Sequence, residues 1–279
     1  MQLLRSYFKM VGYIVKNKYR CSKFTVLLDY SRLIIGSILF HKLGRKKRQQ
    51  APLSASIAGN IFQFFSYPQV ISLFEEIFIA QQYKFDIELN QNANIIDCGS
   101  NIGLSILYFR LTFPNTPVIA FEPDKDAFTL LEKNIRRNRI TNVTLHNVAL
   151  TDVESDVQLF ANKNGSFLNM SLFPHPDQLQ VSETVTSRKL SSFINRQHTF
   201  IKIDTEGAEY AIIKDVIETG AINLIRQMII ECHNTHTTQT PATLTTDLQN
   251  KQFTCVHTNH PLFLNAPETL IYATQQAPK

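Results

Sequence analysis

Short apolar runs alternate with helical patterns along most of this chain. Runs short enough for buried strands lie at residues 94–98, 118–121, 143–148, 200–203, 227–232, 253–256 and 270–273. Apolar positions at helical spacing follow the first, second and fourth of these runs, over 102–111, 124–137 and 209–219, and Thr240-Pro241 starts a further helix. Strands that alternate with helices predict an α/β fold, with a mainly parallel seven-stranded sheet covered by helices on both faces.

Two segments depart from this alternation. Residues 151–195 contain short apolar runs at 157–160, 167–171 and 181–186, which predict short strands or a hairpin inserted into the fold. Residues 61–83 carry a helical pattern, and 85–89 are short enough for a strand. We place the start of the main domain near residue 55, so that it covers residues 55–279 with an insertion at about 151–195.

The first 54 residues form an extension with a pattern of its own. Apolar residues recur at helical spacing from Leu3 to Val15 with basic residues off that stripe, and a second helical run covers Phe24 to Phe40. The second run is barely long enough to span a membrane and holds Asp29 and Arg32 near its centre, so a buried or interfacial helix is favoured over a span. Two interpretations stay open for the basic helix: packing on the main domain, or peripheral membrane contact through residues 1–48.

Charge is distributed unevenly along the chain. Residues 1–50 carry twelve Lys or Arg and one acid, for a net charge of +11, whereas the remaining 229 residues carry 16 basic and 22 acidic side chains, for −6. A nucleic-acid-binding domain usually carries positive charge on its folded body, so no nucleic-acid partner is expected. The four cysteines show no CxxC spacing, which favours a reducing, cytoplasmic location over a disulfide framework.

Polar residues follow most of the predicted strands at the point where each strand ends. They lie at 97–103, 122, 147–149, 204–209 and 231–233. In an open α/β sheet ligands bind beyond the carboxyl ends of the strands. These residues should therefore gather at one edge of the sheet and form one binding site.

The loop after the first strand predicts the kind of ligand. A strand, a glycine turn and a helix start form a nucleotide-binding loop, and Glu122 after the next strand can accept hydrogen bonds from ribose hydroxyls. Dinucleotide binding requires G-x-G-x-x-G, but here Gly99 and Gly103 enclose Asn101. Asp97 would repel a pyrophosphate and would suit the ammonium of S-adenosylmethionine. The Asp-x-Gly-x-Asn-x-Gly pattern resembles the first motif of class I methyltransferases.

A second block narrows this resemblance to one family. Residues 200–209, Phe-Ile-Lys-Ile-Asp-Thr-Glu-Gly-Ala-Glu, are similar to the "KIDxEGxE" block of FkbM-type methyltransferases. The blocks at 121–123, 148–150 and 230–233 stand in that family's order, so the resemblance covers about residues 90–275. One departure is Ser100, where the family often has Ala. The resemblance implies a Rossmann-like class I methyltransferase fold.

The same resemblance implies an activity and a set of site residues. It implies transfer of a methyl group from S-adenosylmethionine, usually to an oxygen of a sugar or secondary metabolite, so the expected partner is a small-molecule or glycan acceptor. Asp204 would lie near that acceptor, beside the cofactor. The residues that would bind the cofactor with Asp204 are Asp97, Gly99, Ser100, Asn101, Gly103, Glu122, Pro123, Val148 and Ala149.

A hydroxyl acceptor also needs a group that removes its proton. We expect catalytic roles for Asp204, Glu206 and His233, and His233 is the base best suited to neutral pH. The alternative for His233 is a polar strand-end residue bonded to a carbonyl. Glu209 is expected to be a structural acid at a helix start.

Metal chemistry is an alternative that we do not expect. Asp204, Glu231 and His233 could bind a divalent ion, whereas the pairs His233/His236 and His257/His260 have no cysteine partners at zinc-finger spacing. Two alternatives to O-methylation stay open: N-methylation of an amine or amide, and a cofactor-binding scaffold without turnover.

Overall fold

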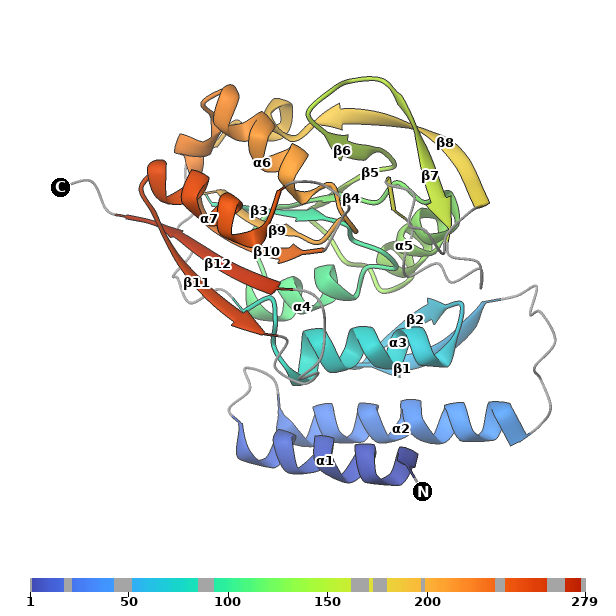
Figure 1. Cartoon of the computed structure of the whole chain (residues 1–279). Coiled ribbons are helices and arrows are strands. Elements are labelled where there is room, and N and C mark those ends of the chain that lie inside the picture. The colour runs from blue at the N-terminus through green and yellow to red at the C-terminus, as the bar shows by residue number, and fades with distance from the viewer. Residues whose placement is uncertain are drawn as a thin grey trace. The chain divides into compact units, whose positions relative to one another are not determined.

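The computed structural model describes residues 2–17, 22–42, 52–84, 93–161, 171–172, 180–196, 199–233, 239–259 and 269–276 (Figure 1). The chain divides into two compact units. The first unit comprises Met1–Lys84, Ile102–Pro114 and Leu130–Ile140, and the second comprises Phe85–Asn101, Asn115–Thr129 and Thr141–Lys279. The predicted strand at 85–89 lies outside the described residues.

A seven-stranded sheet forms the centre of the second unit. Its order is β11-β12-β10-β9-β3-β4-β5, and only β12 runs antiparallel to its neighbours, so the predicted mainly parallel sheet is confirmed. The strands are β3 (Asn94–Cys98), β4 (Val118–Phe121), β5 (Val143–His146), β9 (Thr199–Ile203), β10 (Ile225–Cys232), β11 (Phe253–Asn259) and β12 (Thr269–Gln275). The sheet grows from β3 through β4 to β5 and then returns to the other side of β3 with β9. The switch point of the topology therefore lies between β3 and β9, where ligands bind in such sheets.

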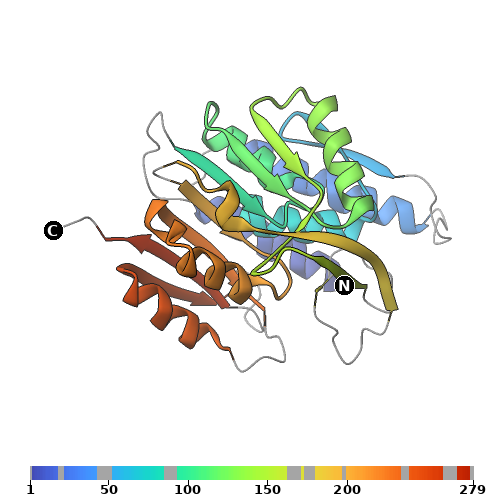
Figure 2. The same cartoon turned by 90° about the horizontal axis from the view of Figure 1, so that it is seen from above.

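One face of this sheet packs against helices of the same unit. Alternate strand residues point to that face, as the two-residue period of a strand requires. They pack with α6 (Glu209–Glu218) and α7 (Pro241–Asn250) (Figure 2). The strand residues in this core include Ile96, Cys98, Ile201, Ile203, Met228, Ile230, Ile271 and Ala273. Thr240 caps α7 through a capping box and Pro241 stands in its first turn, as predicted.

The predicted insertion contains a strand pair. β6 (Ala149–Thr151), β8 (Gln180–Lys189) and β7 (Asp156–Ala161) form a small sheet, in which β7 and β8 are antiparallel. The predicted run at 143–148 is interrupted, since β5 ends at His146 and β6 begins at Ala149. Most of the predicted strand at 167–171 lies outside the described residues, but Ser171 forms a bridge with Phe160. A short helix, η2 (Leu190–Phe193), follows β8, and η3 (Ala221–Leu224) precedes β10.

The first unit is mainly helical. It contains α1 (Gln2–Lys16), α2 (Lys23–Lys42), the hairpin β1 (Leu53–Ile57) and β2 (Asn60–Phe64), then α3 (Tyr67–Phe74), the π-helix η1 (Glu75–Ile79) and α4 (Leu104–Thr112). The helix α5 (Lys125–Arg137) begins among residues of the second unit and ends among those of the first. The two predicted N-terminal helices are thus confirmed.

The prediction of a helix over residues 61–83 was wrong in its first part. Ala58 and Gly59 have positive φ angles of 48° and 77° and form a tight turn, which pairs β2 with β1. Phe62 and Phe64 are buried at the two-residue spacing of a strand. The helix starts only after Ser66, whose side chain caps α3, with Pro at its first turn.

Polar side chains anchor α2 within the first unit. The buried Asp29 carboxylate accepts a hydrogen bond from the backbone N–H of Ala58 (2.6 Å), and the buried Tyr30 hydroxyl donates to Glu75 Oε1 (2.6 Å). Burial raises the pKa of both Asp29 and Glu75 above their usual range. By length and composition α2 could cross a membrane, in a search of the described residues only. The contacts of Asp29 and Tyr30 are nevertheless those of a helix that packs within a folded unit.

We expect Tyr30→Phe to destabilise the chain. The substitution removes the donor to Glu75 and leaves that carboxylate buried, at a cost of about 1–3 kcal/mol in the free energy of unfolding. Urea denaturation measures this loss. Tyr7→Phe is the comparison variant, because Tyr7 is half-buried and water can replace its hydrogen bond to Ser31. Equal losses in the two variants would contradict a special role for the Tyr30–Glu75 bond.

Candidate functional site

The loops after β3 and β9 meet at the switch point of the sheet. The backbone N–H groups of Gly99 and Ser100 donate to Phe121 O (3.0 and 2.9 Å), and the N–H of Asp204 donates to Cys98 O (3.1 Å). Gly99 has a φ of 81°, and a Cβ at this position would collide with the carbonyl oxygen of Asp204. Glycine is therefore required here by the neighbouring loop itself, whatever ligand binds above it.

A buried lysine ties these two loops together. Lys202 is the last residue but one of β9, and its ammonium donates to the carbonyl oxygens of Gly99 (2.5 Å) and Cys98 (3.1 Å). It also pairs with Asp204 Oδ2 (3.3 Å) and Asp97 Oδ1 (3.4 Å). Burial opposes the charge, but Asp204 and Asp97 outweigh it and raise the pKa of Lys202 above its usual range. The ammonium therefore remains charged.

The carboxylate of Glu122 shapes the loop after β3. Its Oε2 accepts from the backbone N–H of Asn101 (2.8 Å) and its Oε1 from that of Asp124 (2.9 Å). Asn101 has a φ of 47°, in the left-handed region that asparagine tolerates. Burial raises the pKa of Glu122 to about 7, against the opposing effect of the two N–H donors and Lys202.

The other predicted cofactor residues have more varied surroundings. Ser100 is buried and donates to Asp97 O (3.0 Å), while Pro123 is half-buried and its carbonyl accepts from Asn147 (3.0 Å). Val148 is half-buried against the core, and Ala149 is buried at the start of β6. Within the first unit, Gly103 precedes α4 with a φ of 93°, and a Cβ there would press on Leu131.

Glu209 organises the turn that follows β9. It is fully buried, and its Oε1 accepts from the backbone N–H groups of Thr205 (3.1 Å) and Gly207 (3.0 Å). The same oxygen lies 3.1 Å from Nδ1 of His233, which follows β10. Because a carboxylate accepts, the hydrogen bond places a proton on Nδ1 and directs Nε2 away from Glu209.

Three predicted catalytic residues converge at this point. His233 Nε2 lies 3.4 Å from Glu206 Oε2 and 4.0 Å from Asp204 Oδ1. Burial lowers the pKa of His233, but Glu206, Glu209 and Asp204 outweigh it, so that the pKa lies well above its usual value. The role of His233 as base therefore stays a prediction, and the carboxylates of Asp204 and Glu206 lie beside its ring as alternative proton acceptors.

The insertion reaches this cluster through Ser171. Its hydroxyl donates to the backbone carbonyl of Glu206 (2.6 Å). Glu206 has a φ of 54° and Gly207 one of 117°, so the turn passes through left-handed backbone next to the cluster. A left-handed conformation is costly for a residue such as glutamate, and such strain is often stored at functional sites.

Not all predicted residues come together. Glu231 is buried on β10, where its charge helps to raise the pKa of Lys202, and Glu206 takes its expected place beside Asp204 and His233. His257 bonds to Thr245 (2.7 Å) on the surface. His236 and His260 lie outside the described residues. Sequence reasoning assigned no role to Lys202, although a lysine within an otherwise apolar strand was an available signal.

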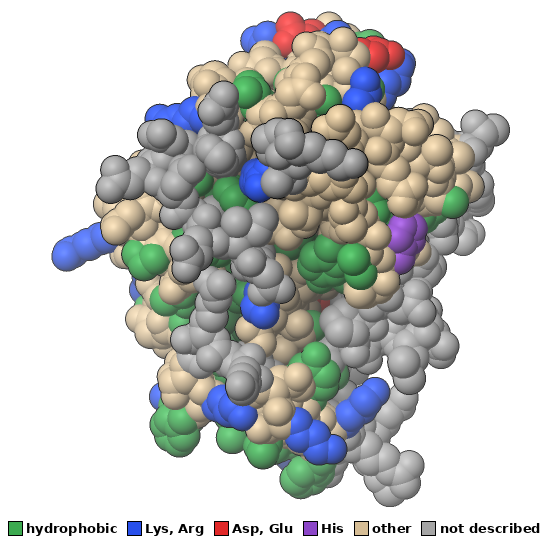
Figure 3. All heavy atoms as spheres, turned by 90° about the vertical axis from the view of Figure 1, so that its left-hand side faces the viewer, with side chains coloured by type: hydrophobic (Ala, Val, Ile, Leu, Met, Phe, Trp, Pro, Cys, Tyr) green, Lys and Arg blue, Asp and Glu red, His purple; other side chains and the backbone are tan. Residues whose placement is uncertain are grey.

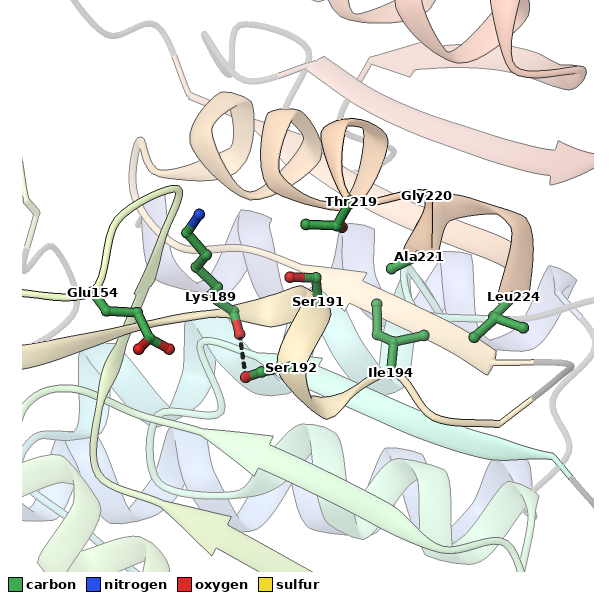
Figure 4. Close-up of a pocket in the computed structure, with 9 residues that line it drawn as sticks. All are labelled: Glu154, Lys189, Ser191, Ser192, Ile194, Thr219, Gly220, Ala221 and Leu224. Carbon is green, nitrogen blue, oxygen red and sulfur yellow. Dashed lines mark hydrogen bonds between the residues drawn. The ribbon is translucent and has the colours of Figure 1, made fainter.

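A shallow pocket lies elsewhere in the second unit. It has a volume of about 400 Å³ and is lined by residues from the end of β8, η2, the end of α6 and η3 (Figure 4). Residues 199 and 225, where β9 and β10 begin, come after these segments, so the pocket lies at the amino ends of the parallel strands. The acids and His233 lie at the carboxyl ends. This pocket is therefore not the site described above.

Comparison with known proteins identifies the family to which this chain belongs. The strand order and the acids at its switch point define a class I methyltransferase fold. The model of the FkbM methyltransferase domain matches residues 97–257, more than half of the chain. The chain therefore belongs to the FkbM methyltransferase family.

Individual relatives are distant. Methyltransferase 1 of Beauveria bassiana (strain ARSEF 2860) is 25% identical over 184 residues, which cover 58% of this chain and 73% of that protein. The 31-O-demethyl-FK506 methyltransferase FkbM of Streptomyces tacrolimicus is 30% identical over 153 residues, covering 54% of this chain and 56% of that protein. Among solved structures, a methyltransferase from Pyrococcus furiosus covers 88% of this chain and 98% of its own at 13% identity, with a TM-score of 0.38 that is too low to carry an argument.

Glu122 should make stability fall as the pH rises towards neutrality. Its pKa is 4.5 in an ordinary environment and about 7 in the folded chain, so the folded state binds the proton more tightly. This contribution is fully present below about pH 4.5 and is lost as the pH rises through about 7, a change of about 3 kcal/mol in the free energy of unfolding. Urea denaturation between about pH 5 and pH 8 measures it, and Glu122→Gln should reduce the drop.

A matched control separates this effect from a general loss of charge. Glu132→Gln removes a carboxylate at an exposed position of α5 and should keep the drop of the unsubstituted chain. The same drop in Glu122→Gln would mean that Glu122 is already charged at the lower pH.

Proposed function

We propose that this chain is an S-adenosylmethionine-dependent O-methyltransferase whose acceptor is a hydroxyl of a small molecule or glycan. The observation that carries the proposal is the convergence of Asp204, Glu206 and His233 beside the loop after β3, at the switch point of the sheet. The name of the Streptomyces relative, which specifies an O-methylation, supports the same kind of acceptor.

The residues present fit such a cofactor. When bound, S-adenosylmethionine supplies a methyl group on a positively charged sulfur. Each oxygen of Glu122 accepts one backbone N–H and keeps a lone pair for a ribose hydroxyl. Asp97 is fully buried and paired with Lys202, so in this proposal it holds the loop in shape, and Glu122 is the acid that contacts the cofactor.

The cluster after β9 and β10 provides what a hydroxyl acceptor needs. As the acceptor oxygen bonds to the methyl carbon, the carbon–sulfur bond breaks with its electron pair left on sulfur, and the hydroxyl proton must leave. The carboxylates of Asp204 and Glu206 are partly exposed and can take this proton. They can also fix the direction of the hydroxyl, and much of the rate in such a displacement comes from positioning.

Calorimetry and methyl-transfer assays test the proposal together. S-adenosylhomocysteine should bind the chain, and Glu122→Gln should weaken it by about 1.5–3 kcal/mol through loss of charge-assisted hydrogen bonds. Glu206→Gln should leave this binding in place and lower transfer to a hydroxyl acceptor by about 10²-fold or more. Asp152→Asn, which removes a surface partner of Lys214, is the matched control and should change neither.

Each contrary result selects a different alternative. Failure to bind S-adenosylhomocysteine would overturn the enzyme proposal. Binding without transfer to any acceptor would favour a non-catalytic scaffold, and a product methylated on nitrogen would favour an N-methyltransferase acting on an amine or amide.

A further inference from the structure

The cluster of Asp204, Glu206 and His233 has the geometry of a metal site. Each side chain offers one ligand atom, and the three atoms lie within 4.8 Å of one another. Two ligands about 2.0–2.2 Å from one ion lie roughly 3–3.6 Å apart at octahedral or tetrahedral angles. The 3.4 Å from His233 Nε2 to Glu206 fits this spacing, and the 4.0 Å to Asp204 exceeds it by a few tenths of an ångström.

The histidine is already oriented as a metal ligand. Its Nδ1 is held by the fully buried carboxylate of Glu209, and its Nε2 faces the other two carboxylates. A metal-bound histidine usually donates its second ring N–H to such a carboxylate, which fixes the ring and the tautomer. The carboxylate of Glu209 is itself fixed by hydrogen bonds from the backbone N–H groups of Thr205 and Gly207, so the carboxylate that orients the histidine ring is also held in place.

The charges around the cluster favour an added cation. Lys202 is the cation that pairs with the acids at the switch point, and it already bridges two of them. In the described part of this region, Lys202 is outnumbered by acidic side chains. These are Asp97, Asp204, Glu206, Glu209 and Glu231. A divalent ion would balance this excess of negative charge.

We propose that Asp204, Glu206 and His233 bind one divalent metal ion, and that the acceptor hydroxyl occupies a free position on it. The second clause rests on the proposed function, whereas the first does not. Two carboxylates and one imidazole suit Mn²⁺ or Mg²⁺ and leave coordination positions for water and substrate. An ion there would lower the pKa of the hydroxyl that it binds, so that the proton would pass more readily to water while Asp204 and Glu206 serve as ligands.

Binding of Mn²⁺ tests the site without any methyl transfer. The full-length chain is freed of metal with EDTA, dialysed and titrated with Mn²⁺, while electron paramagnetic resonance follows the free ion. We expect one ion per chain and roughly 10- to 100-fold weaker binding in Glu206→Gln and in His233→Asn. Asp152→Asn, outside the cluster, should bind as the unsubstituted chain does, and melting curves confirm that each variant is folded.

The outcomes separate this proposal from the function proposed above. No binding of Mn²⁺, or binding that neither substitution weakens, would overturn the metal site. Methyl transfer that persists in EDTA would overturn the role of the ion and leave the methyltransferase proposal standing. Binding of Mn²⁺ without binding of S-adenosylhomocysteine would overturn the methyltransferase proposal and leave the metal site standing.

A second inference rests on the outer side of α1 and α2, within the first unit. On α2, Phe24, Ile35 and Leu39 are 71%, 55% and 53% exposed, and their spacing places them on one face of the helix. On α1, Phe8 and Val15 are 66% and 61% exposed and lie seven residues apart, again on one face. Figure 3 shows hydrophobic side chains next to Lys and Arg side chains at the lower end of the surface, over these helices.

The opposite side of α2 is fully engaged. Asp29 and Tyr30 lie on that side and hold the helix to the β1–β2 turn and to Glu75. A helix with one side packed in a folded unit and exposed apolar residues on the other lies in the plane of an interface rather than across a membrane. Exposed apolar patches of this kind usually mark an interaction surface.

Charge identifies the partner as an anionic lipid surface. Five basic residues on the two helices are exposed: Lys9, Lys16, Lys23, Arg32 and Lys42. These exposed positive charges would be repelled by those of a second copy and attracted by anionic headgroups. We infer that α1 and α2 attach the chain peripherally to an anionic membrane.

Sedimentation with vesicles tests this attachment. The full chain should bind vesicles of phosphatidylcholine and phosphatidylserine mixed at about 2:1, and bind far less to phosphatidylcholine alone or at high salt. The double variant Phe24→Ser/Ile35→Ser should bind roughly 10-fold or more weakly, since two apolar side chains are lost. Val256→Ser is the matched control, because Val256 on β11 is 55% exposed, as Ile35 is.

Three results would overturn the inference. They are absence of binding to both vesicle types, equal binding by the double variant and the control, and a lipid-free dimer that the double variant abolishes. The last result would show that this face pairs with a second copy of the chain.

Discussion

The ammonium of Lys202 is the charge on which the arrangement of the site depends. It lies near the end of the fully buried strand β9, where an unpaired charge would be very costly. Its cost is offset because two carbonyl oxygens from the end of β3 and two carboxylates, Asp97 and Asp204, surround it. The loop after β3, the strand β9 and the start of the turn at residues 204–209 are thereby fixed to one group.

A second set of contacts extends this order to the turn at residues 204–209 and to the end of β10. Glu209 gathers two backbone N–H groups of the acidic turn and the ring of His233 on one buried oxygen. Lys202 and Glu209 thus perform opposite tasks. Lys202 neutralises the acids beside the loop after β3. Glu209 instead holds the turn at residues 204–209 close to His233, so that the remaining acids repel one another. This repulsion favours the binding of a proton or a cation.

Sequence reasoning identified the parts of this site that depend on position along the chain. Asp97 lies near the end of a strand, and Glu122, Asp204 and His233 each follow one. Because parallel strands bring their ends to one edge, their convergence could be predicted. The partners of these residues could not be predicted, because they depend on side-chain direction across neighbouring strands. Glu231 points towards Lys202 while Glu206, through its left-handed backbone, reaches His233. The hairpin of β1 and β2 was missed because its Ala-Gly turn carries a weak signal and the apolar spacing of residues 61–64 fits both periods.

The contact between Gly99 and the carbonyl of Asp204 has a mechanical consequence. With no side chain to separate them, the two loops touch backbone to backbone, and neither can be displaced without moving the other. In the proposed function the loop after β3 binds the methyl donor and the turn at residues 204–209 faces the acceptor. These two segments should therefore move together. Filling the donor side would set the position of the acceptor acids, which gives a physical basis for an ordered sequence of binding in which the donor enters first.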